Sequence, residues 1–146
     1  MWKTETAIDI AAPVEVVYEY LADFSRHPEW STGVEELVPV GQGPVAVGQE
    51  LKATEKIPAR FTSYTRVTAL EPERRIAWES GDGRNMKVKW AFELTSQNGR
   101  THLVQRADVE PTSLIGKILL AVLRKRQIPG ENAQSLAQIK ANLEEQ

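Results

Sequence analysis

Four polar residues lie on strand faces that are otherwise apolar, and their chemistry is the first clue to function. They are Glu55, Ser63, Thr65 and Gln105. A buried polar group costs about 1–3 kcal/mol unless it is paired, and a cavity filled with water or ligand removes that cost. Apolar walls with a few convergent polar groups are also typical of small-molecule sites. We therefore predict a ligand cavity at these residues; exposure at a sheet edge is the alternative explanation.

Glu55 is the candidate for acid–base chemistry. It alternates with Leu51, Ala53 and Ile57 in the segment Glu50–Ile57, so it shares their side of a predicted strand. A carboxyl group in an apolar pocket has a raised pKa, which suits it to exchange protons near neutral pH. If this chain is catalytic, we expect Glu55 to be the general acid or base.

Three tryptophans, Trp30, Trp78 and Trp90, could stack on an aromatic ligand. Their rings are large and rigid, and each carries one N–H donor. Each of the three could equally serve as an anchor of the hydrophobic core.

Other catalytic patterns are missing from the sequence. There is no cysteine, so disulfide and thiolate chemistry are excluded. His27 precedes a proline in a corner and His102 falls on the outward side of its strand, so both are predicted to be surface residues. Two isolated histidines give no metal-ligand spacing, and we expect neither a metal nor a tightly bound cofactor. No Ser-His-Asp order or nucleophile elbow is present.

Three further polar segments have structural explanations. Arg106 and Asp108 are predicted to form a solvated pair on the outer face of their strand. Arg124-Lys125-Arg126 lies near the end of a predicted helix, where cations complement the helix dipole; contact with anionic lipid or a partner is the alternative. The glycine-rich segment Gly41–Gly48 is followed by a strand and not by Lys-Ser/Thr and a helix, so it predicts a turn and no phosphate-binding loop.

Length and composition limit the class of protein. The 146 residues fit one domain, 1–146, and the net charge of -2 gives no general attraction to nucleic acid. The longest apolar stretch, Leu114–Leu123, is far shorter than the roughly 20 residues of a membrane span. The N-terminal residues lack the pattern of a signal peptide, so we expect a cytoplasmic protein without integral membrane association.

The order of the predicted elements is unusual. Trp2–Ile10 alternates with a period of two, which indicates a strand with one buried face. Pro13 suits the first position of a helix, and Val14–Leu21 carries an apolar stripe about two turns long. Phe24–Pro28 is predicted as a second short helix or turn. Two short helices therefore separate the first strand from the second.

Hairpin-linked strands follow, and the chain closes with a helix. The predicted strands are Val34–Val40, Glu50–Ile57, Phe61–Leu70, Ile76–Ser80, Met86–Leu94 and Thr101–Val109. Gln97-Asn98-Gly99 is a hairpin signal, and Ser113 could cap a helix that begins at Leu114. Pro129-Gly130 interrupts the helical pattern, and the sequence leaves open whether two helices or one kinked helix result.

This order, and the residues that carry it, resemble one superfamily. The matching pieces are IDIAAPVEVVYEYLAD, Pro28-Glu29-Trp30, Gly43-Pro44…Val47-Gly48, Val67…Trp78 and Trp90…Thr101. They are similar to the START-like (SRPBCC) proteins, in particular the polyketide cyclase/dehydrase and lipid-transport branch. The resemblance implies an α+β helix-grip fold, in which a seven-stranded curved antiparallel sheet wraps around a long C-terminal helix. A pocket for an apolar or aromatic small molecule is implied between them, with Trp30 near its mouth.

In such a fold the concave face of the sheet and the closing helix supply the candidate ligand-binding residues. The full set is Trp30, Leu51, Ala53, Glu55, Ile57, Ser63, Thr65, Trp78, Val88, Trp90, Gln105, Ala107, Leu119 and Leu123. Ile115 is a further position on the same helix. For the aliphatic members, core filling is the competing explanation.

Three functions remain open at this point. The first is non-covalent binding of a hydrophobic or aromatic small molecule that is lipid- or polyketide-like. We expect no other partner. The second is a polyketide cyclase or dehydratase with Glu55 as general acid/base. The third is a protein-interaction module with a collapsed cavity, which an exposed apolar patch at Leu114–Leu123 would favour. The sequence carries no signal for the oligomeric state.

Overall fold

A seven-stranded antiparallel sheet forms the body of the computed structural model, which describes residues 2–40, 46–55 and 61–144. Its strands are β1 (Trp2–Ile10), β2 (Val34–Pro39), β3 (Glu50–Glu55), β4 (Phe61–Glu71), β5 (Arg75–Gly81), β6 (Met86–Gln97) and β7 (Arg100–Pro111). The spatial order is β1-β7-β6-β5-β4-β3-β2, and every neighbouring pair is antiparallel. The predicted sheet is thereby confirmed. The predicted strand position Ile57 and most of the glycine-rich turn at Gly41–Gly48 lie outside the described residues.

Two short helices follow β1, as predicted: α1 (Val14–Ala22) and the 3₁₀ helix η1 (Phe24–Glu29). Pro13 was expected at the first position of the helix. In the structure it is the N-cap residue, and α1 begins one residue later at Val14. The Asp23 carboxylate caps η1 by accepting a hydrogen bond from the Ser25 backbone N–H at 3.2 Å. A capped, tight 3₁₀ turn is what brings the chain from α1 back toward the sheet.

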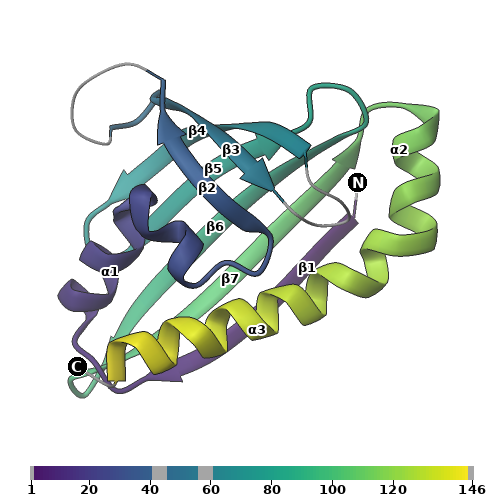
Figure 1. Cartoon of the computed structure of the whole chain (residues 1–146). Coiled ribbons are helices and arrows are strands. Elements are labelled where there is room, and N and C mark those ends of the chain that lie inside the picture. The colour runs from purple at the N-terminus through teal and green to yellow at the C-terminus, as the bar shows by residue number, and fades with distance from the viewer. Residues whose placement is uncertain (1, 41–45, 56–60, 145–146) are drawn as a thin grey trace.

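The closing helix is one uninterrupted run made of α2 (Leu114–Leu119), the π-helical turn η2 (Leu120–Arg124) and α3 (Lys125–Glu144). In Figure 1, α3 runs along β1, while α1 and α2 lie near opposite ends of the sheet. Pro129 lies inside α3, so the question left open by the sequence is resolved in favour of one helix. Pro129 has no N–H for the Lys125 carbonyl, so α3 lacks one intrahelical hydrogen bond at this point.

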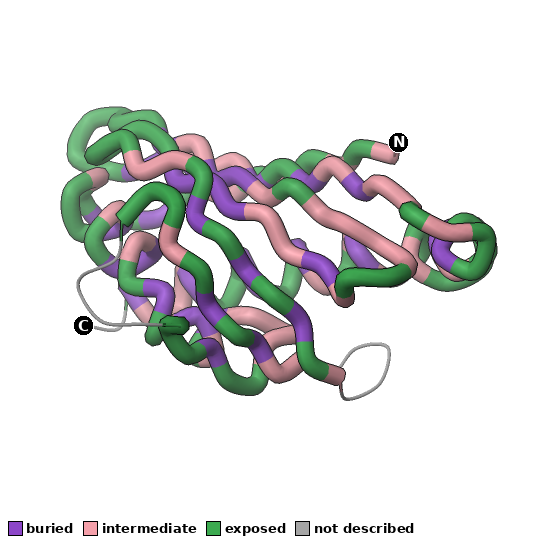
Figure 2. The backbone as a smooth tube through the Cα atoms, turned by 90° about the horizontal axis from the view of Figure 1, so that it is seen from above, coloured by how far each residue is buried: buried purple, intermediate pink, exposed green. Residues whose placement is uncertain are grey.

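Most of the core lies between the sheet, α1, η1 and α3. Its largest fully buried side chains include Phe24, Phe92, Ile10, Leu21, Leu136 and Ile139. A second, smaller cluster comprises Ala107, Val109, Leu120 and Ile128, and Trp90 packs against both clusters. Figure 2 shows the alternation of buried and exposed residues along the strands that this arrangement produces.

The segment Leu114–Leu123 differs from the sequence expectation. Ile115 and Leu123 were expected to face the concave side of the sheet, but they are 62% and 37% exposed. Ile115 belongs to α2, which lies beyond the end of the sheet and approaches the Asn85 backbone at Gly116, and Leu123 belongs to η2, the turn that joins α2 to α3. None of the described helices is both long and apolar enough to cross a membrane.

Candidate ligand site between the sheet and the closing helix

A small cavity of about 60 Å³, here called the inner chamber, lies between the concave face of the sheet and the helices. The sheet contributes Ala53, Glu55, Thr65, Trp78, Trp90 and Gln105. The helices contribute His27, Arg124, Glu131, Asn132 and Ser135, and Trp30 adds its ring from the end of η1. Since one water needs roughly 10–15 Å³ of such volume, the inner chamber has room for a few waters or one small polar group.

A larger cavity of about 500 Å³, here called the outer chamber, adjoins the first. Its apolar wall includes Phe61, Met86, Val88 and Leu119, and its polar rim includes Asp82, Arg84 and Asn85. Four residues line both chambers and so form a partition between them: Glu55, Ser80, Trp90 and Arg124. The outer chamber has the size of a typical small-molecule pocket.

The 3₁₀ geometry of η1 sets the aromatic end of the inner chamber. With three residues per turn, Phe24, His27 and Trp30 fall on one face. Their rings pack in sequence, with centroids 4.4 Å apart for Phe24 and His27 and 4.6 Å apart for His27 and Trp30. The Trp78 ring from β5 lies 5.1 Å from that of His27. The helical corner and the sheet therefore meet in one aromatic cluster.

His27 is a correction to the sequence analysis, which predicted a surface residue. It is 2% exposed, because the 3₁₀ turn directs its ring inward among the aromatic residues. Burial lowers the pKa of the imidazole from 6.5 to about 3, and a hydrogen bond to the Leu21 backbone carbonyl acts weakly against this. The ring is therefore neutral at pH 7. Its Nε2 has no hydrogen-bond partner within the protein.

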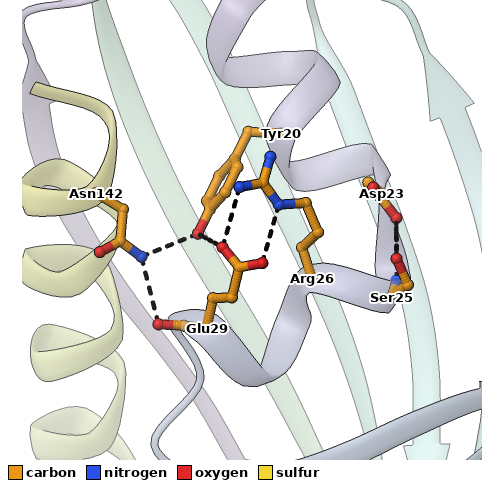
Figure 3. A network of polar contacts seen from close by, with 6 residues as sticks. All are labelled: Tyr20, Asp23, Ser25, Arg26, Glu29 and Asn142. Atoms are coloured by element: carbon orange, nitrogen blue, oxygen red, sulfur yellow. Dashed lines mark hydrogen bonds and ion pairs between the residues drawn. The ribbon is translucent and has the colours of Figure 1, made fainter. Parts of the chain in front are cut away.

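A network of polar contacts holds the η1 corner in place (Figure 3). The Glu29 carboxylate accepts hydrogen bonds from the Arg26 guanidinium at 3.0 and 3.1 Å and from the Tyr20 hydroxyl at 3.2 Å. Asn142 on α3 donates to the Tyr20 hydroxyl at 2.9 Å and to the Glu29 backbone carbonyl at 3.3 Å. The network joins α1, η1 and α3, so the residues at the aromatic end of the inner chamber are held from three sides.

Buried polar atoms without a partner gather around the inner chamber. Among the described residues, six buried side-chain atoms lack a hydrogen bond, and four of these belong to lining residues: His27 Nε2, Trp30 Nε1, Gln105 Oε1 and Asn132 Nδ2. A fifth, Ser63 Oγ, lies on β4 opposite the lining residue Ala53. Each such atom costs about 1–3 kcal/mol when nothing pairs with it. The cluster is therefore suited to a polar group or waters held in the chamber.

Glu55 lies in the partition, half-buried. Burial raises the pKa of its carboxyl above 4.5; the nearby Ser63 hydroxyl, which is not in hydrogen-bond geometry, and the Arg124 guanidinium act against this rise. Arg124 is itself engaged by Glu131 in a bidentate ion pair at 2.8 and 3.1 Å, with Gln127 as a further acceptor at 2.7 Å. The positive charge at the partition is thus already paired.

The other predicted residues fall into two groups. Trp78 and Trp90 stack with centroids 6.2 Å apart, and the Trp90 indole N–H donates to the Ser80 hydroxyl at 2.9 Å. Thr65 and Ala53 line the inner chamber, whereas Val88 and Leu119 line the outer one. Leu51 and Ala107 are buried in the two core clusters and Leu123 is exposed, so these three line neither chamber.

The charged residues predicted for the outer face are also paired differently from expectation. Arg106 pairs with Glu5 and Glu93, while Asp108 faces Lys3 at 3.8 Å. The reason is register: β1 and β6 flank β7 and place their own charges beside each residue. Elsewhere on β7, His102 Nδ1 lies 2.7 Å from Asp9. Within the ranges that the structure describes, no group of three acidic or histidine side chains could hold a metal ion.

Sequence reasoning missed several lining residues on the closing helix. Asn132 and Ser135 are 3% and 4% exposed, and they interrupt the buried stripe formed by Ile128, Leu136 and Ile139. That stripe follows helical spacing, so its two polar members could have been found by the same argument that selected Glu55 and Gln105 on the strands. His27 carried a similar signal, since it lies three residues from an aromatic residue on each side.

Solved structures with the same architecture define the class of the fold. A START superfamily protein from Mycobacterium smegmatis is 17% identical with a TM-score of 0.73, over 98% of this chain and 97% of that one. The Zhui aromatase/cyclase from Streptomyces sp. R1128 is 18% identical with a TM-score of 0.70, over 94% and 93%. A protein from Thermus thermophilus is 17% identical with a TM-score of 0.75, over 97% of both chains. The fold is therefore the helix-grip fold of the START superfamily.

The family follows from the sequence itself. A family model described as "Polyketide cyclase / dehydrase and lipid transport" matches residues 1–144. The chain belongs to this family, as its resemblance indicated. No protein with a curated function matches it in sequence.

Proposed function

We propose that the protein binds an apolar or aromatic small molecule non-covalently between the sheet and the closing helix. The observation that carries the proposal is the pair of adjoining chambers, one of about 500 Å³ with an apolar wall and one of about 60 Å³ with unpaired polar atoms. The apolar body of a ligand would gain free energy by leaving water. The stacked rings of Trp78 and Trp90 offer it a rigid aromatic wall.

Of the two features expected of a protein-interaction module, an exposed apolar patch and a collapsed cavity, only the first is present. Leu114, Ile118 and Val122 are 74%, 54% and 63% exposed, which agrees with an apolar patch on the closing helix. The same alternative required a collapsed cavity, however, and both chambers are open. Ligand binding is therefore the better-supported function.

A titration with 2-methoxynaphthalene tests the proposal, followed by saturation-transfer NMR on the ligand signals. We expect saturation transfer to the naphthalene ring with the wild-type protein. Val88→Trp should abolish it, because Val88 lines the outer chamber and a larger ring would fill it. Lys89→Trp is the matched control, because the next residue of β6 is exposed and lines neither chamber.

Two results would contradict ligand binding at this site. The first is no saturation transfer with the wild-type protein from 2-methoxynaphthalene or from its hydroxyl analogue 2-naphthol at any concentration that remains dissolved. The second is undiminished transfer with folded Val88→Trp, because the probe would then be bound elsewhere.

A second candidate function is acid–base catalysis on a polyketide-like substrate. It is favoured by one observation: Glu55 lies where the two chambers meet and burial raises its pKa. Under this alternative the outer chamber holds the chain of a poly-β-ketone, and the Glu55 carboxyl exchanges a proton with it.

Glu55→Gln separates the two candidates, because glutamine keeps the shape and removes the titratable proton. If the protein is a binder, the variant should keep its affinity for 2-methoxynaphthalene within about twofold. If it is an enzyme, the wild type should convert an added poly-β-ketone thioester and Glu55→Gln should lose at least about a hundredfold in rate, the typical contribution of a general acid or base. Conversion at equal rates by both proteins would remove Glu55 from the reaction.

A further inference from the structure

We infer that the inner chamber is a head-group pocket for an uncharged hydroxyl, such as a phenol or an enol, on a ligand whose apolar body occupies the outer chamber. The inference rests on the proposed function and goes beyond it, because it assigns the chemical class and the orientation of the ligand. The hydroxyl end would point toward His27 and Trp30, and the hydrocarbon end toward Val88 and Leu119.

The first argument is the pairing of a free acceptor with a free donor. His27 uses one ring nitrogen in the hydrogen bond to the Leu21 carbonyl, so the unpartnered Nε2 of the neutral ring is an acceptor. Trp30 Nε1 is a donor and has no acceptor. Their rings are neighbours, with centroids 4.6 Å apart. A hydroxyl group donates one hydrogen bond and accepts others, so its chemistry complements both atoms.

Two buried amides extend the same pattern. Gln105 Oε1 from β7 is an unpaired acceptor, and Asn132 Nδ2 from α3 is an unpaired donor. Both side chains are 3% exposed, and both line the inner chamber. A head group with a second oxygen, such as a β-hydroxy ketone or an enol beside a carbonyl, would meet these as well.

The second argument concerns charge. Among the described residues that line the inner chamber, Arg124 is the only cation, since His27 is neutral, and the Arg124 guanidinium is held by Glu131. Two carboxyl groups also line the inner chamber, that of Glu55 from the sheet and that of Glu131 from α3. A carboxylate or phosphate head would therefore lose its hydration without gaining a free positive partner. The site favours a neutral head group.

The third argument concerns size and preorganisation. A volume of about 60 Å³ admits the oxygen-bearing edge of a ring but no second ring. The polar network at η1 and the packing of Phe24, His27 and Trp78 already fix the donor and acceptor, so little conformational entropy is lost on binding. A site that is built to bind a hydroxyl discriminates strongly against an analogue without it, because its buried polar atoms then remain unpaired.

Three probes that differ only at the head group test the inference: 2-naphthol, 2-methoxynaphthalene and 2-naphthoate. At pH 7 the first is a neutral donor and acceptor, the second cannot donate, and the third is an anion. We expect the Kd of 2-naphthol for the wild-type protein to be at least tenfold lower than that of 2-methoxynaphthalene. The Kd of 2-naphthoate should be higher than both.

Variants of the two ring residues then locate the preference. Trp30→Phe removes the donor and His27→Phe removes the acceptor, and each keeps an aromatic ring in the cluster. In either folded variant, the ratio of the two Kd values should fall to within about threefold. Trp2→Phe is the matched control, because Trp2 lines neither chamber and the tenfold ratio should persist.

The binding results distinguish failure of the head-group inference from failure of the proposed function. If the wild-type protein binds all three probes equally, or if folded Trp30→Phe keeps the full preference, the head-group inference is wrong while ligand binding stands. If it binds none of them, the proposed function fails and this inference fails with it. Should His27→Phe not fold, Trp30→Phe alone decides between these results.

Discussion

His27 is the residue whose burial has the clearest consequence for the whole protein. In the folded state the pKa of its imidazole is about 3, whereas in the unfolded chain it is close to 6.5. Because the folded pKa is lowered, the unfolded state takes up a proton that the folded state excludes. The stabilisation is therefore fully present above pH 6.5 and is lost as pH falls from 6.5 toward 3.

This difference predicts a pH-dependent free energy of unfolding. Between pH 6.5 and 4.5, His27 should cost the wild-type protein roughly 2 kcal/mol, since one pKa unit corresponds to about 1.4 kcal/mol. Glu55 acts in the opposite direction, because its raised pKa lets the folded state hold a proton longer. Urea unfolding of wild type and His27→Gln at several pH values separates the two effects.

The difference between the two proteins is the quantity that tests the prediction. Glutamine does not titrate. Between pH 6.5 and 4.5 the free energy of unfolding of His27→Gln should therefore fall by roughly 2 kcal/mol less than that of the wild type. Parallel curves would mean that His27 is already exposed to protons in the folded state, against its 2% exposure.

At the scale of elements, the sequence predicted most of the sheet but not the position of α2. Period-two alternation locates β1 and β6 because one face of each packs on the core. The same kind of reasoning placed Ile115 and Leu123 inside, because their spacing is that of a buried stripe. Both are exposed, since the place where a helix ends relative to the sheet depends on contacts distant in sequence. For Pro129 the sequence left open whether two helices or one kinked helix would result, and the structure shows one helix that continues through it.

The sequence predicted those site residues whose burial follows from the alternation of apolar residues along a strand. Glu55, Thr65 and Gln105 interrupt apolar strand faces, and the structure places all three around the inner chamber. Their role in binding remains a prediction. His27 was not found, because a histidine before a proline suggests an exposed corner. Only the 3₁₀ geometry of η1 turns its ring inward.

Two glycines of the closing helix offer a matched test of how α2 is attached. A Cβ at Gly116 would lie 1.8 Å from the Asn85 backbone carbonyl oxygen, whereas a Cβ at Gly130 would meet nothing within 4 Å. Gly116→Ala should therefore detach α2 from the β5–β6 loop and lower the Tm. Gly130→Ala should raise the stability by about 0.5–1 kcal/mol, because alanine favours the helix.

Thermal unfolding and binding of 2-methoxynaphthalene should both be measured for these variants. Because Asn85 and Leu119 line the outer chamber, Gly116→Ala should also weaken binding, and Gly130→Ala should leave it unchanged. Equal Tm values for the two variants would show that α2 does not rest on Asn85 as the structure has it.

At the scale of the whole molecule, the fold encloses two chambers that differ in size and polarity. The helix-grip architecture is shared with proteins of 17–18% identity, so the architecture does not specify the ligand. In this chain, an inner chamber with unpaired polar atoms adjoins an outer chamber with an apolar wall. An amphipathic ligand would then enter with its polar end first.

Native mass spectrometry of the protein incubated with excess 2-naphthol, beside its denatured mass, tests the central claim most directly. We expect a 1:1 complex in the native spectrum that disappears on denaturation and is absent for Val88→Trp. An additional bound mass in protein taken directly from the expression host would, after fragmentation, identify the class of the natural ligand. A native mass equal to the denatured mass, both before and after incubation, would contradict the account.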